Sequence, residues 1–203
     1  FATGGIFVVT ITINDDDTGV NDDSVLAWVS GVRIKDGVLQ VIGTGTDDQV
    51  TINQQGNGTL KVHASFLQTG NFETFALADV EKILAYLCEG DDHFNIAGNI
   101  DIPGIIHGDG GDDHLKGIGG PTVLLGGAGN DSLIGGAGQD IMIGGTGNDR
   151  LVGGSGSDVL IGGSTTIDDD DDALMDVLAA WTADESYDDR VDAIDALITV
   201  IDD

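Results

Sequence analysis

Four consecutive copies of one nine-residue sequence, between residues 126 and 161, constrain the fold more than any other feature of this chain. They read GGAGNDSLI, GGAGQDIMI, GGTGNDRLV and GGSGSDVLI, with no insertion between them. Each copy has Gly at positions 1, 2 and 4, Asp at position 6 and a large apolar residue at position 8. A unit this short cannot bury its apolar residue alone, so successive copies must stack on one another. The repeat therefore predicts a solenoid.

The glycines predict tight turns, and the residues around position 8 predict short strands. Glycine adopts backbone conformations that a side chain disfavours, and it leaves carbonyl oxygens uncovered. Position 8 is flanked by residues that point the opposite way, as in a strand that buries one side chain. Its occupants are Leu133, Met142, Leu151 and Leu160. Two copies complete a coil of about eighteen residues, so copies n and n+2 lie on the same edge of a flattened solenoid.

The aspartates at position 6 predict a column of bound cations along each edge. Asp131 would lie beside Asp149 on one edge, and Asp140 beside Asp158 on the other, about one strand spacing (~4.8 Å) apart. Carboxylates this close repel one another. Calcium takes roughly six to eight carboxylate and carbonyl oxygens, so an ion between neighbouring turns would replace the repulsion by a bridge. Because the short strands bury little apolar surface, we expect calcium binding and folding to be coupled.

The repeat register continues upstream of the perfect copies. Residues 108–116 (GDGGDDHLK) place Asp113 at position 6, where it would share a site with Asp131. Residues 117–125 (GIGGPTVLL) place Thr122 there instead, so the sequence predicts a weak or vacant site at that turn.

Looser versions of the motif contain Asp92 and Asp48, which are further candidate calcium ligands. The strands between them, such as TLKVHASF and VEKILAYL, are longer than those of the repeats. Residues 37–107 therefore predict an irregular β-solenoid that leads into a regular calcium-binding β-roll over residues 108–167.

The N-terminal segment predicts a β-hairpin. Residues 7–13 (FVVTITI) and 24–32 (SVLAWVSGV) read as strands around the acidic turn at residues 15–17, which could bind calcium or be solvated. Two strands do not make a stable domain. We therefore interpret residues 1–36 as the terminal strands of an immunoglobulin-like sandwich from a longer chain, or as strands that another copy completes.

The C-terminal segment, residues 168–203, predicts a helical cap. A run of five aspartates ends at Asp172, which suits a helix N-cap, and apolar residues then recur at helical spacing. Ser186 resembles the start of a capping box for a second helix. We expect these helices to close the open end of the solenoid. Position 9 of the perfect copies is also apolar, which predicts outward stripes that pack on these helices or on another subunit: Ile134, Ile143, Val152 and Ile161.

Charge and motif content exclude several classes of function. The formal net charge is −29, which is incompatible with binding nucleic acid and unfavourable for binding an anionic membrane. No apolar run is long enough to span a membrane. Neither H-E-x-x-H nor G-x-S-x-G occurs, so we predict that the chain is not an enzyme. Calcium sites of modest affinity fill outside cells, which predicts an extracellular location.

The nonapeptides resemble the RTX, or hemolysin-type, calcium-binding repeats of secreted bacterial proteins. Residues 1–36 look like the final strands of a PKD- or cadherin-like module, as found before such repeats in large surface proteins. The resemblance implies an all-β parallel roll, secretion and roughly four to six calcium ions. The implied ligands are the carboxylates of Asp113, Asp131, Asp140, Asp149 and Asp158, and the turn carbonyls of Gly126, Ala128, Gly135, Ala137, Gly144, Thr146, Gly153 and Ser155.

The sequence predicts a non-catalytic structural module of an extracellular surface, matrix or filament protein. Its partners would be calcium, neighbouring domains and further copies of itself, joined through the incomplete N-terminal sheet. The alternative is the C-terminal secretion and folding domain of an RTX-type secreted enzyme.

Overall fold

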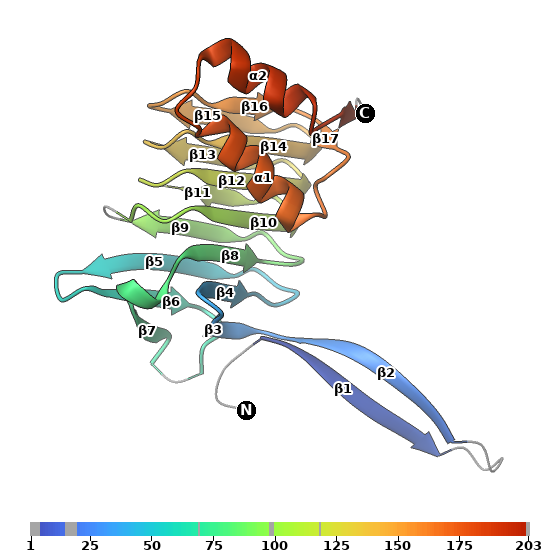
Figure 1. Cartoon of the computed structure of the whole chain (residues 1–203). Coiled ribbons are helices and arrows are strands. Elements are labelled where there is room, and N and C mark those ends of the chain that lie inside the picture. Colours follow the sequence, from blue (N-terminus) through green and yellow to red (C-terminus); the bar gives the residue numbers. More distant parts are fainter. Residues whose placement is uncertain (1–4, 15–19, 69, 98–99, 118, 202–203) are drawn as a thin grey trace.

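The computed structural model describes residues 5–14, 20–68, 70–97, 100–117 and 119–201. Its main body is a solenoid built from two seven-stranded sheets that face each other across one core (Figure 1). Sheet I contains, in spatial order, β16 (Val159–Ile161), β14 (Ile141–Thr146), β12 (Thr122–Ala128), β10 (Gly104–Gly110), β8 (Lys82–Tyr86), β4 (Val38–Ile42) and β3 (Gly31–Lys35). Sheet II contains β15 (Arg150–Gly154), β13 (Ser132–Gly136), β11 (His114–Lys116), β9 (His93–Ala97), β5 (Gln49–Gln55), β6 (Thr59–Ala64) and β7 (Phe72–Ala76). A short 3-10 helix, Leu77–Asp79, follows β7.

The chain alternates between the two sheets, and consecutive coils pair in parallel with a constant register. Val123 of β12 pairs with Ile141 of β14, eighteen residues later, and β11, β13 and β15 follow the same spacing in sheet II. The preceding coil is longer, because Ile83 of β8 pairs with Gly104 of β10. The predicted solenoid and its eighteen-residue coil are therefore confirmed.

The core between the sheets is a column of position-8 side chains. Leu115, Leu124, Leu133 and Met142 are fully buried there. Leu160 in the last coil is 49% exposed, because no further coil stacks on it. The burial of each position-8 residue thus depends on the next coil, as expected for a repeat protein.

Two C-terminal helices are present as predicted: α1 (Asp171–Trp181) and α2 (Tyr187–Asp195). α1 packs on the outer face of sheet I, where Leu125, Ile143 and Ile161 contact an apolar cluster that includes Leu178 and Trp181. α2 packs on α1 near the last coil (Figure 1), and the two helices leave Leu160 at the end of the roll half exposed. The position-9 stripe of sheet I offers the helices more apolar surface than the single exposed Leu160 at the end.

The start of α1 is fixed to sheet I by a polar cluster. Asp171 accepts hydrogen bonds from the Tyr86 hydroxyl and from His107 Nε2 (2.9 Å), and the two rings stack at 4.5 Å. These bonds lower the pKa of Asp171 although burial opposes them. The N-cap is Asp170 rather than the predicted Asp172, because the Asp170 backbone is extended and its carboxylate accepts from the Ala173 N–H.

Ser186 caps α2 as predicted, since its Oγ accepts from the Asp189 N–H, but the Asp189 carboxylate accepts from the Ser186 hydroxyl rather than from its backbone N–H. The segments that flank the helices also pair with each other. β17 (Ser164–Thr165) and β18 (Val200–Ile201) form a two-stranded antiparallel sheet. No helix in the described part of the chain has the length and hydropathy needed to cross a membrane.

The N-terminal hairpin is a separate two-stranded antiparallel sheet of β1 (Gly5–Asn14) and β2 (Val20–Val29). The predicted pairing is confirmed. The acidic turn at residues 15–17 lies outside the described residues. Since no third strand of the described chain joins this sheet, its origin in an immunoglobulin-like module stays a prediction.

Replacing Asp171 by Ala should undock α1 from sheet I. The change removes the carboxylate that accepts from His107 Nε2 and from the Tyr86 hydroxyl, which should make the free energy of docking less favourable by about 1–3 kcal/mol. In a Trp28→Phe background, fluorescence of Trp181 should shift to the red at a lower temperature than in the parent. The exposed neighbour Asp172→Ala is the control and should change little, so equal shifts in both variants would contradict the docking role.

Candidate calcium sites

Aspartates 18, 21 and 44 residues apart form one column along an edge of the roll. We call this set the long column: Asp48, Asp92, Asp113, Asp131 and Asp149. The backbone N–H of each residue donates to Oδ1 of the next, at 2.6 Å for the first pair, 2.8 Å for the next two and 2.9 Å for the last. The column therefore joins the regular repeats to the irregular coils upstream.

The opposite edge carries a shorter version, the short column of Thr122, Asp140 and Asp158. Asp140 Oδ1 accepts from both the backbone N–H and the hydroxyl of Thr122, each at 2.8 Å, and the Asp140 N–H donates to Asp158 Oδ1 at 3.0 Å. Thr122 therefore supplies donors where the repeat would place a carboxylate. This arrangement is consistent with the predicted weak or vacant site at that turn.

In most aspartates of both columns, the second carboxylate oxygen is buried without a hydrogen-bond donor. Oδ2 is buried without a hydrogen-bond partner in five aspartates: Asp92, Asp113, Asp131, Asp140 and Asp149. A buried carboxylate oxygen without a partner is costly unless a donor or a cation satisfies it. The same defect at successive turns indicates a ligand of the chain rather than imperfect packing.

A backbone carbonyl lies beside each orphaned oxygen of the regular repeats. A methyl group placed on Gly135 would lie 2.5 Å from Asp140 Oδ2 and 2.6 Å from the Gly153 carbonyl oxygen. The position-1 glycine thus borders a cradle lined by one carboxylate and one carbonyl oxygen. The same cradle recurs at Asp113 with the Gly126 carbonyl, at Asp131 with the Gly144 carbonyl and at Asp149 with the Gly162 carbonyl.

The donor set of these cradles suits a hard divalent cation. Carboxylate and carbonyl oxygens are the ligands that calcium prefers. No group of three or more His, Cys, Asp or Glu side chains converges on one point within the described residues, so a cation here would rely on carbonyl oxygens as well. Glycine at position 1 is required because a side chain would fill the cradle.

Three of the predicted aspartates have different surroundings. Asp158 has its glycine, Gly153, but no next coil to supply a carbonyl. Asp92 has Leu87, five residues earlier, where the regular turns have glycine. Asp48 has its glycine, Gly43, with the Leu87 carbonyl beside it, but both of its oxygens already accept hydrogen bonds from hydroxyl or backbone donors of Ser65 and Thr44. Their roles as ligands stay predictions.

The predicted carbonyl ligands also divide into groups. The carbonyls of Gly126, Gly135, Gly144 and Gly153 lie beside position-6 side chains. Those of Ala128 and Thr146 accept N–H donors from Gly111 and Gly129, and those of Ala137 and Ser155 stay predictions. The sequence does not predict Gly162 as a ligand, because the repeat pattern ends there. In the structure, its carbonyl lies beside Asp149 Oδ2 and completes that cradle.

Burial raises the pKa values of three aspartates of the long column. Desolvation raises the pKa of Asp113 to about 8, that of Asp92 to about 7 and that of Asp131 to about 6, and neighbouring aspartates add to each shift. In the short column, burial raises the pKa of Asp140. Without a cation, Asp92 and Asp113 therefore tend to hold protons near neutral pH.

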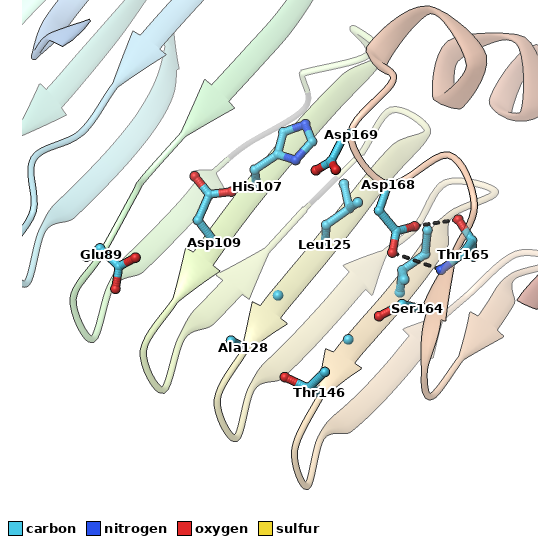
Figure 2. A pocket seen from close by; sticks show the side chains of 13 residues that line it. Glu89, His107, Asp109, Leu125, Ala128, Thr146, Ser164, Thr165, Asp168 and Asp169 are labelled. Atoms are coloured by element: carbon cyan, nitrogen blue, oxygen red, sulfur yellow. Dashed lines mark hydrogen bonds between the residues drawn. The ribbon is translucent and has the colours of Figure 1, made fainter. Parts of the chain in front are cut away.

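A separate pocket of about 460 Å³ lies between β10–β14 and the segment 164–169, away from the columns (Figure 2). Its lining combines the carboxylates of Glu89, Asp109 and Asp169 with the apolar side chain of Leu125. The Asp168 carboxylate at its rim already accepts from the Thr165 N–H and hydroxyl. Among the described residues, the buried carboxylate oxygens without partners lie in the columns and not in this pocket.

Replacing Gly135 by Ala should damage the site of Asp140, because the new methyl group enters the cradle. We expect about tenfold more calcium at the folding midpoint, measured by circular dichroism. Gly56→Ala is the matched control, since nothing lies within 4 Å of a methyl group there. Surface changes of this kind usually stay within about 0.5 kcal/mol. Equal calcium requirements in both variants would contradict the cradle.

The raised pKa values predict how stability depends on pH. The folded state binds more protons at Asp92, Asp113 and Asp131 than the unfolded state, so the stability of the chelated protein should fall as pH rises from about 4 to about 8. The melting temperature in chelator should thus be higher at pH 5 than at pH 8. The gain on adding calcium should grow over the same range. Asp113→Asn should reduce this dependence, and an unchanged dependence would rule out the column as its source.

Comparison with known families finds a match for the repeats but not for the rest of the chain. Residues 116–151 and 143–165 match the model of the RTX calcium-binding nonapeptide repeat, which covers four copies. No curated protein matches the chain significantly, and no solved structure does. The matched residues contain three of the four complete cradles, those of Asp131, Asp140 and Asp149. Residues 116–165 of this chain are therefore similar to RTX calcium-binding nonapeptide repeats.

Proposed function

We propose that this chain is a calcium-binding structural module of a secreted surface, matrix or filament protein. The observation that carries the proposal is the buried Oδ2 atom without a donor that recurs along both edges of the roll. Four complete cradles, with the incomplete ones at Asp92 and Asp158, support a stoichiometry of roughly four to six ions.

The role of each part follows from its surroundings. The position-6 carboxylates and position-1 carbonyls would hold the ions, and the glycines leave room for them. Bound calcium supplies the positive charge that balances the buried carboxylates. The position-8 column and the helices on sheet I bury the apolar surface that the repeat alone leaves open.

The folded roll would act as a stiff spacer outside the cell, where calcium is abundant. Each ion would join two successive coils, because the Asp and Gly ligands of one cradle belong to neighbouring turns. We place the N-terminal strands, residues 1–36, at the junction with a preceding module, and residues 168–203 as the helical end of the unit. The N-terminal sheet could also add its strands to a further copy.

Calcium titration tests the proposal. Circular dichroism should show a gain of β-structure on adding millimolar calcium to chelated protein, and calorimetry should count roughly four to six ions. Asp131→Asn should lower the count, whereas Asp192→Asn in α2 is the charge-matched control and should leave it unchanged. A folded protein that takes up no calcium would sink the proposal.

A further inference from the structure

The outer face of sheet II is free of acidic residues, although the chain has 36 of them. The residues that point outward from β5, β6, β7, β9, β11, β13 and β15 alternate with the buried ones, and none is Asp or Glu. They include three of the seven Lys and Arg residues and three of the four histidines: Lys61, Lys116, Arg150, His63, His93 and His114. We call this surface the basic face.

Side chains of the basic face contact one another across neighbouring strands. The rings of His93 and His114 stack at 4.9 Å, and the Lys61 ammonium lies 3.7 Å from the centre of the Phe72 ring. The nearest acidic residues along the chain, such as Asp92, Asp113 and Asp149, precede the strands, so the charged side chains of the face itself are Lys61, Lys116 and Arg150.

The opposite side of the roll is strongly acidic. Residues 168–195, which contain α1 and α2, have twelve acidic residues and a single cation, Arg190. Arg190 donates to the Trp181 carbonyl and stacks on its ring, so it neutralises little of this charge. The carboxylates of Asp176 and Asp192 are exposed.

The two charged surfaces lie at the same height of the roll. Helix α1 contacts β10 and β12, whose neighbours along the chain in sheet II are β11 and β13. Lys116 ends β11, and Arg150 starts β15, the next strand beyond β13. A neighbouring copy shifted sideways, without displacement along the roll axis, would therefore set its acidic helices against the basic face.

We propose that calcium-loaded copies of this chain associate side by side, with the basic face of one copy against α1 and α2 of the next. The contact joins two different surfaces, so it leaves one free at each end and can repeat into a row. A second copy fits better than another polyanion because the chain itself carries the complementary acidic surface at the matching height. Ile134 and Val152, which no helix covers, would be buried in the same contact.

This inference rests on the proposed function, because it needs the calcium-folded roll. Sedimentation of the full chain in millimolar calcium should show a mass that rises with concentration at low salt. About 0.5 M NaCl, which shortens the Debye length to a few ångströms, should return it to monomer. Circular dichroism on the same samples separates the two proposals, since a folded, calcium-dependent but monomeric chain contradicts only the association.

Charge reversal locates the contact. Lys116→Glu with Arg150→Glu should raise the dissociation constant about tenfold or more. Asp176→Lys with Asp192→Lys should do the same, and an equimolar mixture of the two variants should associate again. Lys35→Glu is the control for a single charge reversal, because Lys35 lies on β3, away from the basic face. This variant should associate like the parent, whereas Lys116→Glu alone should associate more weakly.

Other occupants give different results. Association that survives both double variants but is lost on removing residues 1–29 would assign it to the N-terminal hairpin instead. Binding of an acidic polysaccharide such as alginate to a monomeric parent, lost in the Lys116→Glu and Arg150→Glu variant, would assign the face to an anionic polymer. Either result would overturn the proposal.

Discussion

The roll depends on one unsatisfied interaction that recurs at five of its turns. A position-6 carboxylate uses Oδ1 to bond the neighbouring coil and leaves Oδ2 buried without a donor. The desolvation of such an oxygen opposes folding unless a proton or a cation balances it. Coil stacking, glycine placement and the burial of the position-8 column all require that this charge be balanced, which makes the fold sensitive to its ionic surroundings.

The glycines and the aspartates are two parts of the same device. At position 1, a side chain would occupy the space between the carboxylate of one coil and the carbonyl of the next. The upstream coils show how the device is lost in steps. Leu87 removes the glycine from the turn of Asp92, and Thr44 and Ser65 satisfy both oxygens of Asp48. The column of hydrogen bonds from backbone N–H groups to Asp Oδ1 atoms nevertheless continues through these turns.

The two outer faces of the roll have different roles although the same repeat builds both. On sheet I, the position-9 residues Leu125, Ile143 and Ile161 form an apolar stripe, and Tyr86 and His107 extend it with a polar end that holds Asp171. On sheet II, the corresponding positions include Lys116, Ile134 and Val152, and no helix covers them. The acidic C-terminal helices thus lie on the side of sheet I, and the Lys, Arg and His side chains of sheet II lie on the opposite side of the roll.

The coil length, the buried position-8 column, the pairing of Asp131 with Asp149 and of Asp140 with Asp158, and the presence of two helices could all be predicted from the amino-acid sequence. These features repeat or are local, so each follows from spacing and residue type alone. Which cradles are complete, why α1 starts at Asp171 and where the helices pack became clear only from the folded chain. Those outcomes depend on residues far apart in the chain, such as Tyr86 and Asp171, that meet only after the coils have stacked. No local sequence pattern shows that such distant residues come into contact.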